Sequence, residues 1–133
     1  MGRMQLALNV ADLDEAIAFY SKLFATEPAK IRPGYANFAI TDPPLKLVLM
    51  AGAGEPGSLN HLGVEVESTD AVAAAAARVA GEGLATEEQL GTTCCFAVQD
   101  KVWVTGPDNN WEIYTVLADA PREEAACEPT GCC

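Results

Sequence analysis

A weak internal repeat is the feature that most constrains how this chain can fold. A shift of 56 residues places one strand-like segment near the N-terminus over a second one in the middle of the chain. The pairs that this shift overlays are Gln5 with His61, Leu6 with Leu62, Leu8 with Val64, Val10 with Val66 and Asp14 with Asp70. A helix signal follows in each copy, so the sequence predicts two similar modules in tandem.

The first module reads as a strand, a helix and three short strands. Met4–Val10 alternates in character, as a strand with one buried face does. Asp12, with Glu15 three residues later, forms a capping box, which predicts a helix over Ala16–Phe24. Turn residues then separate three predicted strands, around Ala29–Ile31, Tyr35–Ile40 and Lys46–Met50.

The second module repeats this order. His61–Glu67 predicts a strand, Ser68 and Thr69 a helix cap, and Gly81 the end of a helix over Asp70–Ala80. Four further strands are predicted near Ala85–Gln89, Cys95–Gln99, Val102–Val104 and Trp111–Val116. The expected fold class is therefore α+β, with two tandem βαβββ modules.

The domain organisation follows from this order and from composition. One domain is expected over residues 1–117, with modules at about 4–50 and 60–117, and a mobile, cysteine-rich tail over 118–133. A chain of 133 residues with 50% hydrophobic content can bury one core. The net charge of −11 argues against nucleic acid and anionic membranes as partners, because binding phosphates requires Lys and Arg. No membrane span or signal pattern stands out, which favours a cytoplasmic protein.

The chain has a single histidine, and two interpretations of it remain open. A lone histidine is often structural or exposed rather than a metal ligand. His61, however, shares its strand face with Gly63 and Glu65, while its neighbours of opposite parity are apolar. It therefore lies on the less apolar face of its strand, as does Gln5, its partner in the repeat.

A carboxylate stands in the last predicted strand. In the segment TGPDNNWEIY, Glu112 and Tyr114 share one face of the strand, and Trp111 and Ile113 share the other. A carboxylate amid large apolar residues is costly to bury unless it is paired or binds a cation. The alternative is a glutamate on an edge strand that faces water.

The five cysteines are unevenly placed. Cys94 and Cys95 are adjacent, and the other three, Cys127, Cys132 and Cys133, crowd the C-terminus. A disulfide framework would spread cysteines through the fold, so free thiols are expected. Adjacent cysteines could both bind one soft trivalent centre such as As(III). The alternative, which the spacing alone favours, is two small buried residues that pack as ordinary hydrophobes.

Several of these features together resemble the vicinal oxygen chelate superfamily, which includes glyoxalase I, extradiol dioxygenases and the bleomycin and fosfomycin resistance proteins. The resemblance rests on the motif PDNNWE, the strand-initial Gln5 and His61, and the two modules, over about Met4–Leu117. It implies that the modules curl into a half-barrel. It also implies that a metal is held by Gln5, His61 and Glu112.

The ligand set narrows the expected metal. Aligning the two final strands puts Lys46 opposite Glu112, where glyoxalase I would need a carboxylate. Three protein ligands then leave coordination positions open, which suits non-haem Fe(II), with Ni, Co, Mn or Zn as substitutes. Gln5 stands where the usual triad has a histidine, and an amide oxygen is the weaker ligand.

The cysteine pair indicates a smaller group of proteins within this superfamily. A Thr-Cys-Cys segment before the last strands and a cysteine-rich acidic tail are similar to the organoarsenical carbon–arsenic lyases, whose relatives include cadmium-induced proteins. This resemblance implies Fe(II)- and O₂-dependent cleavage of the C–As bond of trivalent methyl or aromatic arsenicals, with release of arsenite. Cys94 and Cys95 would bind the substrate, and Cys127, Cys132 and Cys133 could capture it first.

Two other classes of function remain open at this point. One is a metalloid- or cadmium-binding protein that depends on thiols and has no turnover. The other is a different enzyme of the same fold, an isomerase or a dioxygenase. The sequence also leaves open whether the chain forms a homodimer.

Overall fold

The structure is a computed structural model that describes residues 2–94 and 96–120. The chain divides into two compact units, one formed by Arg3–His61 and a second that begins at Leu62. Each unit is built around one βαβββ module, so the predicted α+β class with two tandem modules is confirmed.

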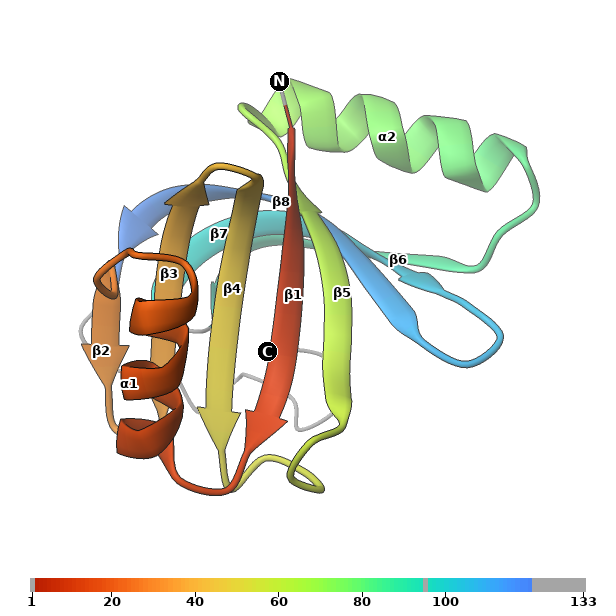
Figure 1. Cartoon of the computed structure of the whole chain (residues 1–133). Coiled ribbons are helices and arrows are strands. Elements are labelled where there is room, and N and C mark those ends of the chain that lie inside the picture. Colours follow the sequence, from red (N-terminus) through yellow and green to blue (C-terminus); the bar gives the residue numbers. More distant parts are fainter. Residues whose placement is uncertain (1, 95, 121–133) are drawn as a thin grey trace. The chain divides into compact units, whose positions relative to one another are not determined.

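The first module follows the predicted order of elements (Figure 1). Its elements are β1 (Arg3–Val10), α1 (Leu13–Leu23), β2 (Lys30–Arg32), β3 (Tyr35–Thr41) and β4 (Pro44–Ala51). The strands run in the order β2-β3-β4-β1, and β1 is parallel to β4 while the other pairs are antiparallel. A parallel pair needs a crossover, which α1 begins.

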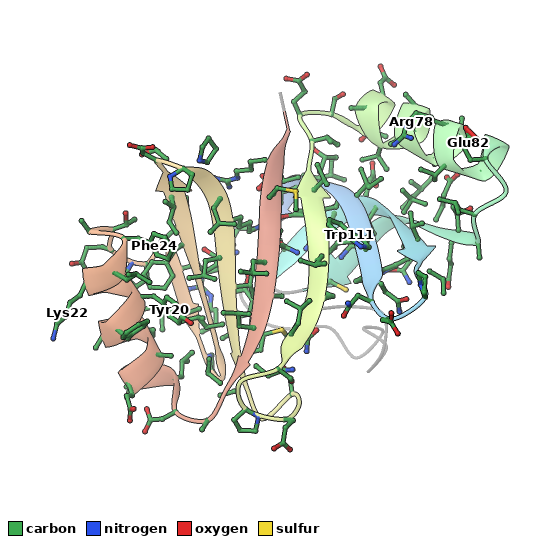
Figure 2. All side chains as sticks on the ribbon, turned by 45° about the vertical axis from the view of Figure 1, so that its right-hand side comes forward. Tyr20, Lys22, Phe24, Arg78, Glu82 and Trp111 are labelled. Carbon is green, nitrogen blue, oxygen red and sulfur yellow. The ribbon has the colours of Figure 1, made fainter. Side chains whose placement is uncertain are left out.

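Helix α1 is held to the sheet by one apolar stripe. Its N-cap is Asp12, whose side chain accepts a hydrogen bond from the Glu15 N–H at 2.9 Å, as the capping box predicts. Figure 2 shows Tyr20 and Phe24 turned toward the sheet and Lys22 turned away. The buried core beneath the stripe consists of Phe38, Ile40, Leu47 and Leu49.

The second module repeats this plan. Its elements are β5 (Leu59–Glu65), α2 (Thr69–Gly81), β6 (Thr86–Cys94), β7 (Ala97–Thr105) and β8 (Asn110–Asp119). The strands run in the order β5-β8-β7-β6, with β5 parallel to β8. Ser68 caps α2, and the helix packs through Val72 and Ala76 onto Val102.

One sequence prediction about this module is wrong. The two short strands expected at Cys95–Gln99 and Val102–Val104 are one continuous strand, β7. Asp100 and Lys101, which lie between the two predicted strands, are buried within the strand. Asp100 accepts hydrogen bonds from the Thr69 hydroxyl at 2.6 Å and from the Gly91 N–H at 2.7 Å. These partners offset the cost of burying a carboxylate in mid-strand.

The last strand extends past residue 117, where the domain is predicted to end, and the division into a domain and a tail stays a prediction. β8 continues to Asp119, and the Ala120 N–H donates to the Phe96 carbonyl at 2.8 Å. The rest of the predicted tail, residues 121–133, lies outside the described residues. In the part of the chain that the structure describes, no helix combines the length and apolar character needed to cross a membrane. The cytoplasmic location stays a prediction.

Candidate functional site

The face of β1 opposite α1 is polar and enclosed. Leu6 and Leu8 pack against the core under α1, while Gln5, Ala7 and Asn9 alternate onto the other face. Gln5 and Asn9 are each only 4% exposed. The sequence predicts this as the less apolar face, and the structure adds that it is the more deeply buried one. Polar groups at this depth need hydrogen-bond partners.

Gln5 and His61, which the repeat pairs in sequence, touch in the first unit. The Gln5 side-chain nitrogen lies 3.2 Å from His61 Nε2, and His61 is 4% exposed. The other ring nitrogen, Nδ1, lies 2.7 Å from the Asn60 side-chain oxygen. A carbonyl oxygen can only accept, so Nδ1 carries the proton and Nε2 carries a lone pair that accepts from the Gln5 amide.

This arrangement fits a metal site in its donor chemistry. A neutral imidazole with its lone pair on Nε2 is a good ligand for divalent transition metals, and an amide in contact with it can add an oxygen. Among the described residues, no group of three His, Cys, Asp or Glu side chains could hold a metal ion.

Glu112 lies on β8 in the second unit and forms an ion pair. Its Oε1 accepts from Lys101 Nζ at 2.7 Å, and its side chain is 3% exposed. β8 has a neighbour on each side, β5 and β7, so it is not an edge strand. The interpretation of Glu112 as a water-facing glutamate on an edge strand is therefore wrong.

Lys101 is a part of this site that the sequence analysis missed. Its side chain is fully buried, and Nζ lies 5.4 Å from the Trp103 ring centre and 5.9 Å from that of Tyr114. In the ladder between β7 and β8, Lys101 pairs with Tyr114 and Trp103 with Glu112. The four side chains thus form a box in which the ammonium contacts one carboxylate and two aromatic rings. In the sequence, the one indication of this cluster was that Lys101 and Trp103 are two residues apart and so lie on the same face of a strand.

The strand registers correct one residue equivalence. In the first unit Ala7 pairs with Val48 on β4, and in the second unit Gly63 pairs with Glu112 on β8. Ala7 and Gly63 are equivalent in the repeat, so the counterpart of Glu112 is Val48 and not Lys46. Val48 is 2% exposed. The first module still offers no carboxylate at the position equivalent to Glu112, because that position is occupied by Val48.

Cys94 ends β6 and is completely buried. It pairs with Ala97 across the β6–β7 hairpin, and its carbonyl accepts from the Gln99 side chain at 2.9 Å. Phe96 in the hairpin has a φ of 61°, a conformation that non-glycine residues adopt only at a cost. Cys94 is disulfide-bonded, contrary to the expectation of free thiols. The other predicted substrate residues, Cys95, Cys127, Cys132 and Cys133, lie outside the described residues.

A cavity of about 450 Å³ opens in the first unit beside the N-terminal turns of α1. Its walls come from the end of β1, from α1 and from Gly57, and they include the carboxylates of Asp12 and Glu15. Asn9 also contributes to the wall, but Gln5 and His61 do not. The cavity therefore lies apart from the two paired side chains.

Comparison with known proteins places these features in a family. Residues 3–112 match the model of the Glyoxalase/Bleomycin resistance protein/Dioxygenase superfamily. The chain is 66% identical over 121 residues to the cadmium-induced protein CadI of Mycobacterium tuberculosis (strain ATCC 25618 / H37Rv), covering 90% of this chain and 80% of that protein. It is 59% identical over 135 residues to a trivalent organoarsenical cleaving enzyme of Thermomonospora curvata, covering 100% of this chain and 89% of that protein.

Solved structures share the fold at low sequence identity. An extradiol ring-cleaving dioxygenase from B. fuscum superimposes with a TM-score of 0.63 at 18% identity, covering 89% of this chain and 33% of that one. A Mn(II)-bound glyoxalase from Novosphingobium aromaticivorans gives a TM-score of 0.62 at 19% identity, covering 96% of this chain and 44% of that one. At these identities the likeness concerns the fold alone.

The buried ion pair leads to a prediction about stability. Lys101→Met should lower the free energy of unfolding by about 3–5 kcal/mol, because it removes the cation from a buried carboxylate. Adding Glu112→Gln should restore much of this loss. Urea unfolding of both variants, with Lys22→Met as the control on the exposed face of α1, measures the effect. A Lys101→Met protein as stable as the control would contradict the role assigned to the pair.

Proposed function

The chain belongs to the Glyoxalase/Bleomycin resistance protein/Dioxygenase superfamily, and from this premise we propose that it cleaves the carbon–arsenic bond of trivalent organoarsenicals. The reaction depends on Fe(II) and O₂ and releases arsenite from methyl or aromatic substrates. The observation that carries this proposal is the similarity along the full chain to a protein named as a trivalent organoarsenical cleaving enzyme. The buried contact between Gln5 and His61 supports a metal-dependent reaction.

The proposed metal ligands are Gln5, His61 and Glu112. His61 offers the Nε2 lone pair, and Gln5 turns its amide so that the oxygen replaces the nitrogen at the site. Glu112 adds a negative charge, and in the second unit it is already balanced by Lys101. When bound, Fe(II) would supply a redox-active centre with coordination positions open to O₂. Other divalent metals, Ni, Co, Mn or Zn, can occupy the same ligands.

The thiols of Cys94 and Cys95 are proposed to hold the arsenic. Trivalent arsenic is a soft centre that prefers thiolates, and two neighbouring thiolates can bond to it together. The Cys94 disulfide has to be reduced before this happens. The hydrogen bond from Gln99 to the Cys94 carbonyl fixes the backbone there, and fixed orientation of a bound substrate is a large part of many rate enhancements.

The overall reaction balances without a further reductant. Methylarsonous acid, CH₃As(OH)₂, and one O₂ give formaldehyde and arsenous acid, As(OH)₃. The carbon loses the four electrons that O₂ gains, and arsenic stays trivalent throughout. One O₂ should therefore disappear for each arsenite that is released.

The experiment that tests this function first loads the protein with metal and substrate, and then starts the reaction by adding O₂. The reduced protein is loaded with Fe(II) under anaerobic conditions and mixed with methylarsonous acid, and O₂ is then added. Arsenite and formaldehyde in equal amounts, over several turnovers, are the expected products. Arsenic that stays bound as the intact methyl compound after O₂ is added would contradict the proposal.

A second candidate function is thiol-dependent binding of cadmium or a metalloid without turnover. The observation that favours it is the identity to proteins named for induction by cadmium, which exceeds that to the organoarsenical cleaving enzyme. Stoichiometric uptake of cadmium or arsenite by the reduced protein, with no arsenite released from the methyl compound, would select this function.

Loss of a ligand should remove both metal and activity. His61→Ala and Glu112→Ala are each expected to abolish arsenite release and most Fe(II) binding, because each removes one of three donors. Gln5→His should bind Fe(II) more tightly, since imidazole is the better donor. Metal content after dialysis and the dissociation constant measure these effects. Wild-type iron content in either alanine variant would show that the ligand set is wrong.

A second set of variants should distinguish the role of the thiols, which is to bind arsenic, from that of the metal. Cys94→Ser and Cys95→Ser are expected to lose arsenical binding and turnover but to keep bound Fe(II), because hydroxyl groups are hard, poor ligands for As(III). Truncation after Ala120 leaves β8 complete and removes Cys127, Cys132 and Cys133, so it should reduce apparent affinity only modestly. Arsenic stoichiometry and arsenite release are measured side by side. Full activity in the Cys94/Cys95 double variant would place the substrate elsewhere.

A further inference from the structure

We propose that a directional chain of hydrogen bonds, which starts at the Glu55 carbonyl and passes through Ser58, Asn9 and Asn60, sets the tautomer of His61. Asn60, Asn9 and Ser58 are then positioning residues, because they act on the site through the imidazole. Their purpose rests on the proposed function, in which His61 Nε2 binds a metal. The tautomer itself can be measured without any metal.

The contacts of this chain all lie in the first unit. Asn60 accepts from His61 Nδ1 at 2.7 Å, and its amide nitrogen donates to the Asn9 side-chain oxygen at 3.0 Å. The Asn9 amide nitrogen donates to the Ser58 hydroxyl at 2.9 Å, and that hydroxyl donates to the Glu55 carbonyl at 2.6 Å. Each side chain thus joins the one before it to the one after.

The direction of the chain follows from its fixed end. A backbone carbonyl can only accept, so the single hydroxyl proton of Ser58 is committed to Glu55 and its oxygen accepts from Asn9. Asn9 must then present its NH₂ group to Ser58 and its oxygen to Asn60.

Asn60 repeats this orientation one step further along. It presents its NH₂ group to Asn9 and its oxygen to His61. The ring can answer an oxygen only with a proton on Nδ1, and Nε2 is left with the lone pair.

Backbone contacts hold Asn9 in place. Its N–H donates to the Ser58 carbonyl at 3.0 Å, and its carbonyl accepts from the Gly57 N–H at 2.9 Å. Gly54 approaches the same side chain so closely that a Cβ atom there would lie 2.7 Å from the Asn9 amide nitrogen. The loop between β4 and β5 is therefore fitted around Asn9, and the orientation of its amide is fixed by surroundings that do not include His61.

This chain matters to metal binding because only one tautomer is competent. A ring with its proton on Nε2 offers the metal no lone pair there, so any such population reduces the apparent affinity. Partners that orient a ligating histidine typically contribute 10- to 100-fold in metal affinity. The chain from Glu55 would keep the competent tautomer populated before a metal arrives.

The protein contains a single histidine, so the protonation of its ring can be measured directly. Protein labelled with ¹⁵N-histidine gives signals from one imidazole ring, and the two ring nitrogens differ strongly according to which one carries the proton. The spectra are recorded without metal at about pH 8.5, where an ordinary imidazole is neutral. The expected result for the wild-type protein is a protonated Nδ1 and a bare Nε2. A protonated Nε2 in the wild-type protein overturns the proposal.

Four variants probe the chain link by link. Asn60→Ala should shift the ring toward the Nε2-protonated form, whereas Asn60→Asp should keep Nδ1 protonated because a carboxylate still accepts. Ser58→Ala and Gly54→Ala should give intermediate mixtures, the first by removing the fixed end and the second by displacing the Asn9 amide without removing any polar group. An unchanged ring spectrum in Asn60→Ala overturns the proposal.

Asn37→Ala is the matched control. It removes a buried amide of the same unit whose hydrogen bond goes to the Tyr35 hydroxyl, outside the chain. Its ring spectrum should equal that of the wild-type protein. A tautomer shift in the control as large as that in Asn60→Ala would mean that the ring responds to general loosening, and this would also overturn the proposal.

A metal titration distinguishes this proposal from the proposed function. Co(II) binding, followed by absorbance, should weaken roughly 10- to 100-fold in Asn60→Ala and stay near the wild-type value in Asn37→Ala. A wild-type protein that shows the expected tautomer but binds no Co(II) would overturn the metal site and leave the assignment of the chain in place.

Discussion

Burial of polar side chains on the strand faces opposite the two helices is the constraint on which the rest of this structure depends. In each module an apolar face packs against a helix, and the opposite face carries polar groups that are almost completely enclosed. An enclosed amide, imidazole or carboxylate costs several kcal/mol unless it finds a partner. The contacts of these side chains with one another are therefore a requirement of the fold before they serve any chemistry.

The two units meet this requirement in different ways. The first unit uses neutral groups, and Gln5, His61, Asn60 and Asn9 satisfy one another through hydrogen bonds. The second unit uses opposite charges, with Lys101 placed between a carboxylate and two aromatic rings. Removing one partner of the buried ion pair would leave an uncompensated charge, which costs more than the loss of one neutral hydrogen bond.

The sequence predicts the parts of this fold that depend on local pattern. The alternation in β1, the cap at Asp12 and the cap at Ser68 all lie where the sequence places them, since each depends on residues a few positions apart. The parity of Gln5 and His61 was likewise available from strand alternation alone.

What the sequence could not supply depends on contacts between distant residues. The interruption predicted within β7 fails because Asp100 and Lys101 find partners on other elements, which no local pattern reveals. The equivalence of Lys46 and Glu112 fails for the same reason. Register is set by pairing across strands, and the pairs of Ala7 with Val48 and Gly63 with Glu112 correct it. The link between Ser58 and Asn9 spans 49 residues, so it too is invisible to local spacing.

The contacts that satisfy the buried groups also set the terms for binding a cation. The lone pair of His61 Nε2 accepts a hydrogen bond from the Gln5 amide nitrogen, and the negative charge of Glu112 is balanced by the Lys101 ammonium. A cation that uses the His61 lone pair has to replace its neutral contact, and one that uses Glu112 has to share or displace its charged contact. The neutral exchange needs only a turn of the Gln5 amide, while the ammonium repels any incoming cation. In the proposed metal site, the Lys101 ammonium would therefore oppose cation binding at Glu112, and the same ammonium pairs with the buried Glu112 carboxylate in this structure.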